Sequence, residues 1–159
     1  MSARVRPLET GDRDAVAKIL ARASNFTVDE IATALELVDE WLSDGPASGY
    51  LTDVVVDSED VVRGYVCFGE APLTVGTYDL YWIAVESAAQ GAGYGQRLLR
   101  FAEDEVRRLD GRLLLIETSS LETYAATQRF YERAGYELIA RLPEYYKPGD
   151  DKLVFAKRI

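Results

Sequence analysis

The stretch Tyr78–Arg100, YDLYWIAVESAAQGAGYGQRLLR, decides how this chain folds. Its first part, Tyr78–Val85, is a strand-like run that ends in a short polar turn. The glycine-rich loop Gln90–Gly95 follows and opens directly into an amphipathic helix that begins near Gln96. A strand, a glycine loop and a helix N-terminus in this order leave backbone N–H groups free at the positive end of a helix dipole. The stretch therefore predicts an anion-binding site.

Three phosphate-binding patterns can be compared with this loop. The dinucleotide fingerprint G-x-G-x-x-G fails, because the sixth place counted from Gly91 is Gln96. A P-loop needs Gly-Lys-Ser/Thr, and no such sequence follows Gly95. The pattern Gln/Arg-x-x-Gly-x-Gly/Ala fits, with Gln90, Gly93 and Gly95 in its places. These glycines let the backbone approach a pyrophosphate, and a glycine-rich turn without a ligand is the alternative reading of the loop alone.

The composition limits the classes of function that the chain can have. Its 159 residues, 48% of them hydrophobic, predict one domain over residues 1–159 with a sizeable core. A net charge of −9 argues against nucleic acid or an anionic membrane as a partner and is compatible with a cationic substrate. The sequence has no run of about 18 apolar residues and no signal-peptide pattern, so we expect a soluble, cytoplasmic protein.

The histidine and cysteine counts exclude several mechanisms. The chain has no histidine, which rules out Ser-His-Asp and Cys-His catalysis and any histidine metal site. Cys67 is the single cysteine, so neither an internal disulfide nor a cysteine zinc cluster can form. It lies in an apolar strand-like run, where we expect a buried structural thiol rather than a nucleophile. We therefore expect no metal site.

The residues before the central stretch predict a strand, two helices and a hairpin. The first helix is expected to be capped by Thr10 and to run to about Ala23. The second is expected to begin at a capping box of Thr27 and Glu30 and to stop at Gly45-Pro46. The predicted strands are Val5–Leu8, Tyr50–Val56 and Val61–Gly69.

The residues from the central stretch onward predict alternating strands and helices. These are a strand at Thr77–Val85, a helix that buries Leu98, Leu99, Ala102 and Val106, a buried parallel strand at Leu113–Thr118, a helix at Tyr124–Ala134, and strands at Tyr136–Ala140 and Lys152–Lys157. A polar loop, Glu144–Asp151, is expected between the last two strands. The order β-α-α-β-β-β-α-β-α-β-β indicates an α/β fold with one mixed sheet and helices on both faces.

Two segments together resemble the GCN5-related N-acetyltransferase (GNAT) family. One is Trp82–Val85 with Gln90–Leu99, and the other is Thr127–Tyr136, which is similar to the family's helix ending in Tyr-Glu-x-x-Gly-Phe. The helix and buried strand between them match the family's spacing, and the resemblance covers roughly residues 51–159. It implies a GNAT-like, mostly antiparallel central sheet and acetyl-CoA-dependent N-acetyltransferase activity.

The resemblance implies where acetyl-CoA binds. The pyrophosphate is expected on the glycine loop, at Gln90, Gly91, Ala92, Gly93, Tyr94, Gly95 and Gln96. The pantetheine arm is expected to run as an added strand along Ile83, Ala84 and Val85, where a bulge in the family separates this strand from Leu113–Thr118. An N–H near Ile83–Ala84 would hold the oxyanion. Tyr124 stands where the family often has an asparagine that contacts pantetheine, and its hydroxyl is the substitute contact.

The resemblance also assigns the proton transfers of a direct attack by the amine in a ternary complex. Tyr131 matches the family's general acid, which protonates the departing thiolate. The base is Asp79, Glu70 or water. Simple strand alternation is expected to put Asp79, Tyr81, Ile83 and Val85 on one face, opposite Leu80, Trp82 and Ala84.

The acceptor cannot be named from the sequence. The loop with Tyr145, Tyr146, Asp150 and Asp151, together with Tyr78 and Tyr81, is expected to face the acceptor and suits a cation. A small amine, an amino acid or a peptide N-terminus fits this description, and a homodimer is compatible with the resemblance. The alternatives are a non-catalytic acetyl-CoA-binding sensor or regulatory domain and a nucleotide-binding module.

Overall fold

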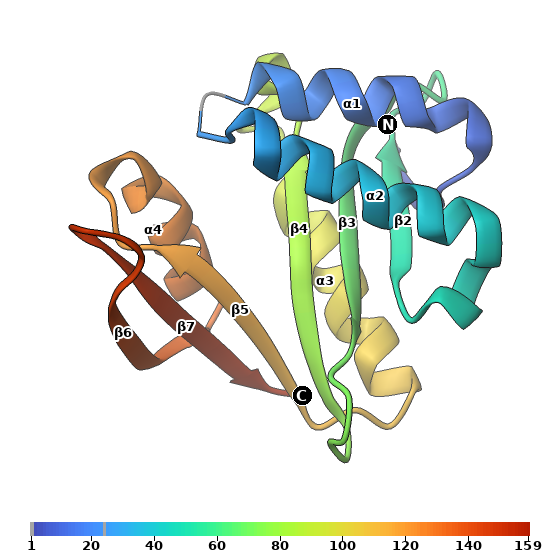
Figure 1. The fold of residues 1–159 in the computed structure, drawn as a ribbon. Helices are drawn as coiled ribbons and strands as arrows, with labels where there is room; N and C mark the ends of the chain where they lie inside the picture. Colours follow the sequence, from blue (N-terminus) through green and yellow to red (C-terminus); the bar gives the residue numbers. More distant parts are fainter. Residues whose placement is uncertain (1, 24) are drawn as a thin grey trace.

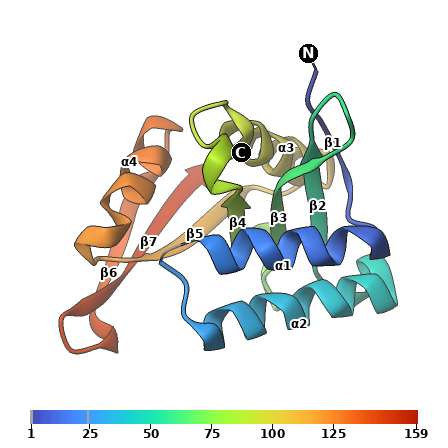
Figure 2. The ribbon, with the colours of Figure 1, turned by 90° about the horizontal axis from the view of Figure 1, so that it is seen from above.

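The computed structural model describes residues 2–23 and 25–159, and its elements follow the predicted order. Figure 1 shows a central sheet with α1 and α2 on one face and α3 and α4 on the other, and Figure 2 shows the same layers from above. The elements are β1 (Arg4–Pro7), α1 (Arg13–Arg22), α2 (Val28–Asp44), β2 (Leu51–Val56), β3 (Val62–Glu70), β4 (Thr77–Val85), α3 (Tyr94–Arg108), β5 (Leu113–Ser119), α4 (Ala125–Arg133), β6 (Glu137–Lys147) and β7 (Asp150–Arg158).

The sheet is mixed and mostly antiparallel, as the sequence predicted. In the described part of the chain seven strands pair in the order β1-β2-β3-β4-β5-β7-β6. Only β4 and β5 are parallel, because α3 crosses over between them, whereas the other neighbours are antiparallel. One core lies under α1 and α2, and a second lies under α3 and α4 (Figures 1 and 2).

The two N-terminal helices begin in different ways. The predicted capping box of α2 is confirmed: the N–H of Glu30 donates to Thr27 Oγ1 at 3.1 Å, and the N–H of Thr27 donates to Glu30 Oε1 at 2.9 Å. The predicted Thr10 cap of α1 is wrong, because a 3-10 turn at Thr10–Asp12 precedes the helix. Asp12 accepts from the N–H of Glu9 at 2.8 Å and pairs with Arg6 at 2.7 Å, so this carboxylate joins the helix start to β1.

The predicted polar loop between the last two strands is also wrong. β6 runs on to Lys147, and only Pro148-Gly149 separates it from β7. β6 forms the edge of the sheet and is almost entirely exposed, so its polar residues do not signal a loop. Its pairing with β7 is interrupted by register shifts between Leu138 and Ala140 and between Leu142 and Lys147, and the second of these accommodates Pro143 at an edge.

A buried carboxyl in β2 predicts a pH-dependent stability. Burial, and secondarily Glu105, raises the pKa of Asp53 from its ordinary value to about 7. A carboxyl whose pKa is raised by folding opposes folding once it ionises, so its penalty is absent below about pH 4, grows between pH 4 and pH 7, and stays at its full size above pH 7. Its full size is roughly 2–4 kcal/mol, since each pKa unit corresponds to about 1.4 kcal/mol.

Replacing Asp53 with asparagine removes this titration. We expect Asp53→Asn to gain stability relative to the unchanged protein between pH 5 and pH 8, measured as the free energy of unfolding in urea. Asp104→Asn, a change at an exposed position of α3, serves as the control and should change the free energy of unfolding by the same amount at pH 5 and at pH 8. Parallel pH profiles for Asp53→Asn and the unchanged protein would contradict the assignment.

Candidate functional site

β4 and β5 separate after a short parallel ladder, and we call this point the fork. Their pairing covers only Thr77–Leu80 with Leu113–Ile116. Beyond it β4 keeps β3 as its neighbour and β5 keeps β7, so each strand has one free edge facing the other. Figure 1 shows the two strands diverging from the fork. Separation of these strands was expected from the resemblance, and the structure confirms it.

A β-bulge at Tyr81 accounts for the fork. Cys67 of β3 is opposite Trp82, but the next residue, Phe68, is opposite Leu80, so Tyr81 is the extra residue of β4. A bulge bends the strand that carries it and interrupts its pairing. The bulge also changes the faces of β4.

The alternation predicted for β4 is therefore wrong beyond Leu80. Leu80 packs with Ile83 and Val85 on the α3 side of the sheet, whereas Trp82 and Ala84 pack under α1 and α2. One inserted residue moved Ile83 and Val85 to the face opposite Asp79.

The free edge of β4 presents the backbone groups of two residues. The N–H of Glu86 donates to the carbonyl of Arg63 on β3 at 2.8 Å. In an antiparallel ladder the direction alternates, so Ala84 also directs its N–H and C=O towards β3, while Ile83 and Val85 direct theirs away from it. β5 has already separated at this level, so this edge can pair with an extended ligand.

The glycine loop brings a helix N-terminus to the same end of β4. Gly91 and Gly93 have φ of 88° and 85°, a backbone region that favours glycine, and a Cβ at either would meet open space. Gly93 is the N-cap of α3, and the first N–H groups of the helix have no partner inside it. The N–H of Ala92 is not free as expected, since it donates to Ala89 O at 3.3 Å. The N–H groups at the first turn of α3 are the donors that suit an anion.

Two arginines add positive charge beside this helix start. An open groove of about 710 Å³ runs past the first turns of α3 and includes Gly93, Gln96, Arg97 and Arg100 in its wall. Both arginines are exposed. Neither arginine is among the site residues predicted from the sequence, although their places at the start of the helix could have suggested a role.

Tyr131 lies on the inner face of α4. Its side chain is only 4% exposed and packs edge-on against the rings of Phe130 and Tyr136, with ring centroids 5.5 and 6.1 Å away. Phe130 in turn lies 3.5 Å from the position a Cβ on Gly95 would take, so α4 touches the glycine loop. Burial raises the pKa of Tyr131, which differs from the unperturbed value assumed from the sequence and keeps the hydroxyl protonated at neutral pH.

A buried polar network holds α4 beside α3. The hydroxyl of Tyr136 donates to Glu103 of α3 at 2.7 Å. Lys157 of β7 donates to the same carboxylate at 3.2 Å and to the carbonyl of Ala134 at 2.9 Å. Since Tyr136 packs against Tyr131, this network keeps Tyr131 at a set place relative to the helix that begins at the glycine loop.

Tyr124 joins the two sides of the fork. Its hydroxyl donates to the carbonyl of Asn25, in the connection between α1 and α2, at 2.8 Å. Burial raises the pKa of Tyr124 to about 12. The hydroxyl's proton is thus already engaged, and only its oxygen lone pairs remain for the ligand contact predicted from the sequence.

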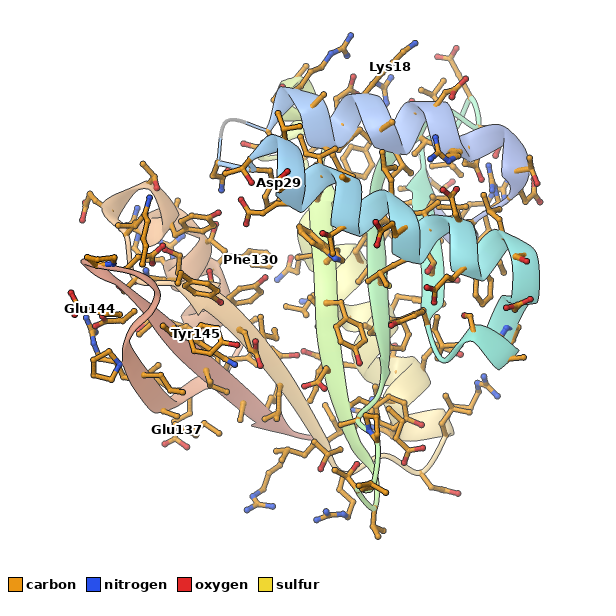
Figure 3. All side chains as sticks on the ribbon, in the orientation of Figure 1. Lys18, Asp29, Phe130, Glu137, Glu144 and Tyr145 are labelled. Carbon is orange, nitrogen blue, oxygen red and sulfur yellow. The ribbon has the colours of Figure 1, made fainter. Side chains whose placement is uncertain are left out.

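Charged and aromatic side chains gather at the fork on the side of α1 and α2. Burial first, and then Glu117 of β5, raise the pKa of Asp79 on β4, while Lys152 of β7 opposes them. Tyr81 packs edge-on against Tyr50 at 5.5 Å. In Figure 3 Tyr145 lies in front of the β6–β7 hairpin, where Lys152 Nζ is 4.4 Å from its ring centroid, whereas Glu137 and Glu144 point outward. Glu117 and Lys152 were missed because nothing in their local sequence marks them.

Several residues expected near the acceptor are engaged elsewhere. Glu70 accepts from the N–H of Gly76 at 3.2 Å and so faces the β3–β4 turn. Tyr78 is buried in the core beside α3 and does not face the fork, which corrects the prediction. Asp150 is buried and accepts from Ser119, and Asp151 accepts from Arg141 at 2.7 Å. Both aspartates thus serve the β6–β7 hairpin.

Three other expectations concern chemistry away from the fork. Cys67 is buried under α1 and α2, and burial raises the pKa of its thiol to about 12, which confirms a structural thiol. Over residues 2–23 and 25–159, no group of three or more His, Cys, Asp or Glu side chains is placed to hold a metal ion. None of the helices described is long and apolar enough to cross a membrane.

Comparisons with known proteins agree with this geometry. A family model described as an acetyltransferase (GNAT) domain matches residues 49–138. Blasticidin-S acetyltransferase of Streptomyces morookaense is 37% identical over 82 residues, which are 51% of this chain and 55% of that protein. The matched segment therefore spans about half the length of this curated relative.

Two solved structures extend the likeness to the whole fold. A crystal structure assigned to the GNAT family, from Desulfovibrio desulfuricans, superposes with a TM-score of 0.94 and 41% identity and covers 99% of both chains. A Salmonella typhimurium protein, whose structure contains its cofactor acetyl-CoA, superposes with a TM-score of 0.75 and 23% identity over 99% of this chain and 94% of that one. The second likeness shows the fold alone.

The glycine loop yields a stability prediction that separates its two inner glycines. Gly93→Ala forces an L-residue into the left-handed region and is expected to lower the free energy of unfolding by about 1–2 kcal/mol. Gly95→Ala is the matched control, because its Cβ would make ordinary contacts at 3.5 Å in the first turn of a helix. Urea denaturation of both variants measures the difference, and equal stabilities would show that the φ of Gly93 is not a constraint.

Proposed function

The chain belongs to the GNAT family of acetyltransferases, and from this premise we propose that it transfers the acetyl group of acetyl-CoA directly to a primary amine in a ternary complex. The observation that carries the proposal is the free backbone edge of Ile83 and Val85, which lies at the same end of β4 as the glycine loop. An extended arm with a pyrophosphate at one end fits this combination. Acetyl-CoA has both features and supplies an activated acyl group as a thioester.

The glycine loop and the start of α3 hold the pyrophosphate in this proposal. The positive φ of Gly91 and Gly93 supports it, because no Cβ stands between the backbone and a ligand there. Arg97 and Arg100 add charge for phosphate groups outside the loop. The remaining loop contacts are assigned to Gln90, Tyr94, Gly95 and Gln96, and Ala92, whose N–H already donates to Ala89 O, is left a packing contact.

The edge of β4 aligns the thioester. Among the three strand residues, Ile83 and Val85 offer free N–H and C=O groups, whereas Ala84 faces β3 with its backbone. We therefore assign the oxyanion contact to the N–H of Ile83, beside the bulge, and leave Ala84 a packing contact.

Tyr131 donates the proton that the departing thiolate takes up. Its burial keeps it protonated, and the contact of Phe130 with the glycine loop region sets α4 close to the bound arm. Asp79 accepts the proton of the acceptor ammonium, because its carboxyl has a raised pKa and stands at the fork on the acceptor side, whereas Glu70 is turned away. The amine attacks the thioester without a protein nucleophile, which agrees with the inert thiol of Cys67.

The acceptor is an amine whose environment is rich in carboxylates and tyrosines. Asp79 and Glu117 stand at the fork, Tyr81 and Tyr145 flank them, and the whole chain carries a net charge of −9. Such surroundings attract a cationic ammonium group and repel anions. Small amines, amino acids and peptide N-termini are the classes to compare, by release of free thiol from acetyl-CoA.

The acid assignment yields a prediction for Tyr131→Phe. Loss of the donor is expected to lower kcat by about 10²–10³-fold while the affinity for CoA is unchanged, since the ring remains in place. Thiol release measures kcat, and calorimetry measures CoA binding. Tyr136→Phe removes a neighbouring buried hydroxyl and serves as the control. It should lower the free energy of unfolding, because a hydrogen bond to Glu103 is lost, and should lower kcat far less than Tyr131→Phe does. An unchanged kcat in Tyr131→Phe would exclude Tyr131 as the acid.

The same measurements separate the proposal from its alternatives. A regulatory sensor domain would bind acetyl-CoA and release no thiol with any amine. A nucleotide-binding module would be stabilised against thermal unfolding by ATP or NAD and not by CoA. Thermal-shift measurements with these three ligands therefore precede the amine screen.

A further inference from the structure

Three charged side chains, Asp79, Glu117 and Lys152, lie on the same face of three neighbouring strands at the fork. Asp79 of β4 is level with Leu115 of β5, and Glu117 follows two residues later on the same face of β5. Ser119 of β5 is opposite Lys152 of β7, which places Lys152 on this face one step beyond Glu117. The neighbouring strands β4, β5 and β7 thus present two carboxylates and one ammonium group in a row across the fork.

Lys152 is held firmly in this row. Its Nζ lies 3.1 Å from Glu117 Oε1 and 4.4 Å from the centroid of the Tyr145 ring. Its side chain is 14% exposed, whereas that of Glu117 is 49% exposed. An ammonium between a carboxylate and an aromatic face has two attractive partners, so its place is well defined. Nothing in the proton transfer described above uses Glu117 or Lys152.

The charges that act on Asp79 come from these same two residues. Glu117 of β5 opposes ionisation of Asp79, and Lys152 of β7 favours it. On β4 itself the titratable neighbour is Tyr81, and β3 presents the uncharged Gly69 opposite Asp79. The two charged neighbours act in opposite directions, and their pairing with each other sets the balance.

We propose that Glu117 and Lys152 are positioning residues that hold Asp79 ready to take the proton of the acceptor ammonium. In this step an N–H bond of the ammonium breaks, an O–H bond forms on Asp79, and the nitrogen lone pair becomes free to attack. Lys152 keeps the carboxylate of Asp79 ionised before the step, and Glu117 makes it a stronger proton acceptor than an isolated aspartate. The proposal rests on the proposed function, in which Asp79 is the base.

Removing the charge of Lys152 and removing the charge of Glu117 must shift the pH dependence of the reaction in opposite directions. Without the positive charge of Lys152, Asp79 faces Glu117 alone and keeps its proton to higher pH. Without the negative charge of Glu117, Asp79 loses its proton at lower pH. A role limited to packing would change the rate or the stability without moving the pH profile in two directions.

The experiment is the pH profile of kcat/KM with acetyl-CoA and the best amine from the screen. The low-pH side of this profile, the acid limb, reports the pKa of Asp79. It is expected to move up by about one pH unit in Lys152→Met and down by a similar amount in Glu117→Gln, which is the pKa shift that one nearby charge causes in a partly hydrated site. The double variant should return the limb close to its original place, and Lys152→Arg, which keeps the charge, should leave it there.

Matched controls change the same charges elsewhere on the β6–β7 hairpin. Lys147→Met removes a positive charge near the turn, and Glu137→Gln removes a negative charge that points outward in Figure 3. Neither should move the limb. The thermal midpoint of each variant shows that it is folded, and Glu117→Gln and Lys152→Arg still test the proposal where Lys152→Met does not fold.

Asp79→Asn distinguishes failure of this inference from failure of the base assignment. If Asp79→Asn keeps the acid limb, Asp79 is not the base and that part of the proposed function falls. If Asp79→Asn removes the limb but Lys152→Met and Glu117→Gln leave it in place, or move it the same way, the positioning role is overturned while the base assignment stands.

Discussion

The structure depends on one extra residue in β4. The bulge at Tyr81 ends the parallel ladder with β5 at Leu80 and turns the next residues away from that strand. Unpaired backbone N–H and C=O groups inside a sheet are costly unless another group satisfies them. Ile83 and Val85 carry such groups in the middle of the sheet, not at its natural edge, which is why we propose that a ligand strand binds to β4 at the fork.

Because the strands separate, the two halves of the sheet need other contacts to stay in register. Below the fork, Glu103 accepts from both Tyr136 and Lys157 and so ties α3 to β7 and to the end of α4. Above it, Tyr124 donates across to Asn25. Directional hydrogen bonds therefore lie on both sides of the fork, whereas Leu98, Leu99 and Ile116 pack in the core between the sheet and α3.

Sequence reasoning reached the element order, the strand Thr77–Val85 with its bounds, and the capping box of α2, because each of these is encoded locally. It did not reach the bulge, since Tyr78–Val85 reads as an ordinary alternating strand, and the extra residue appears only against β3. The faces of Ile83 and Val85 were wrong for that reason. β6 was cut short because exposure on an edge strand removes the pattern that identifies a strand. Glu117 and Lys152 meet only through the pairing of β5 with β7, which no local pattern reveals.

The fork also separates charge within an acidic protein. On the side of α3 the exposed Arg97 and Arg100 stand beside the helix N-terminus, and on the side of α1 and α2 the carboxylates of Asp79 and Glu117 stand beside tyrosines. We propose that the anionic donor and the cationic acceptor approach β4 from opposite faces, each from the side whose charges attract it. In this arrangement the protein needs no nucleophile of its own, since both reacting groups arrive on their ligands. In the reaction we propose, it supplies a free N–H and a proton acceptor from β4, at Ile83 and Asp79, and a proton donor from α4, at Tyr131.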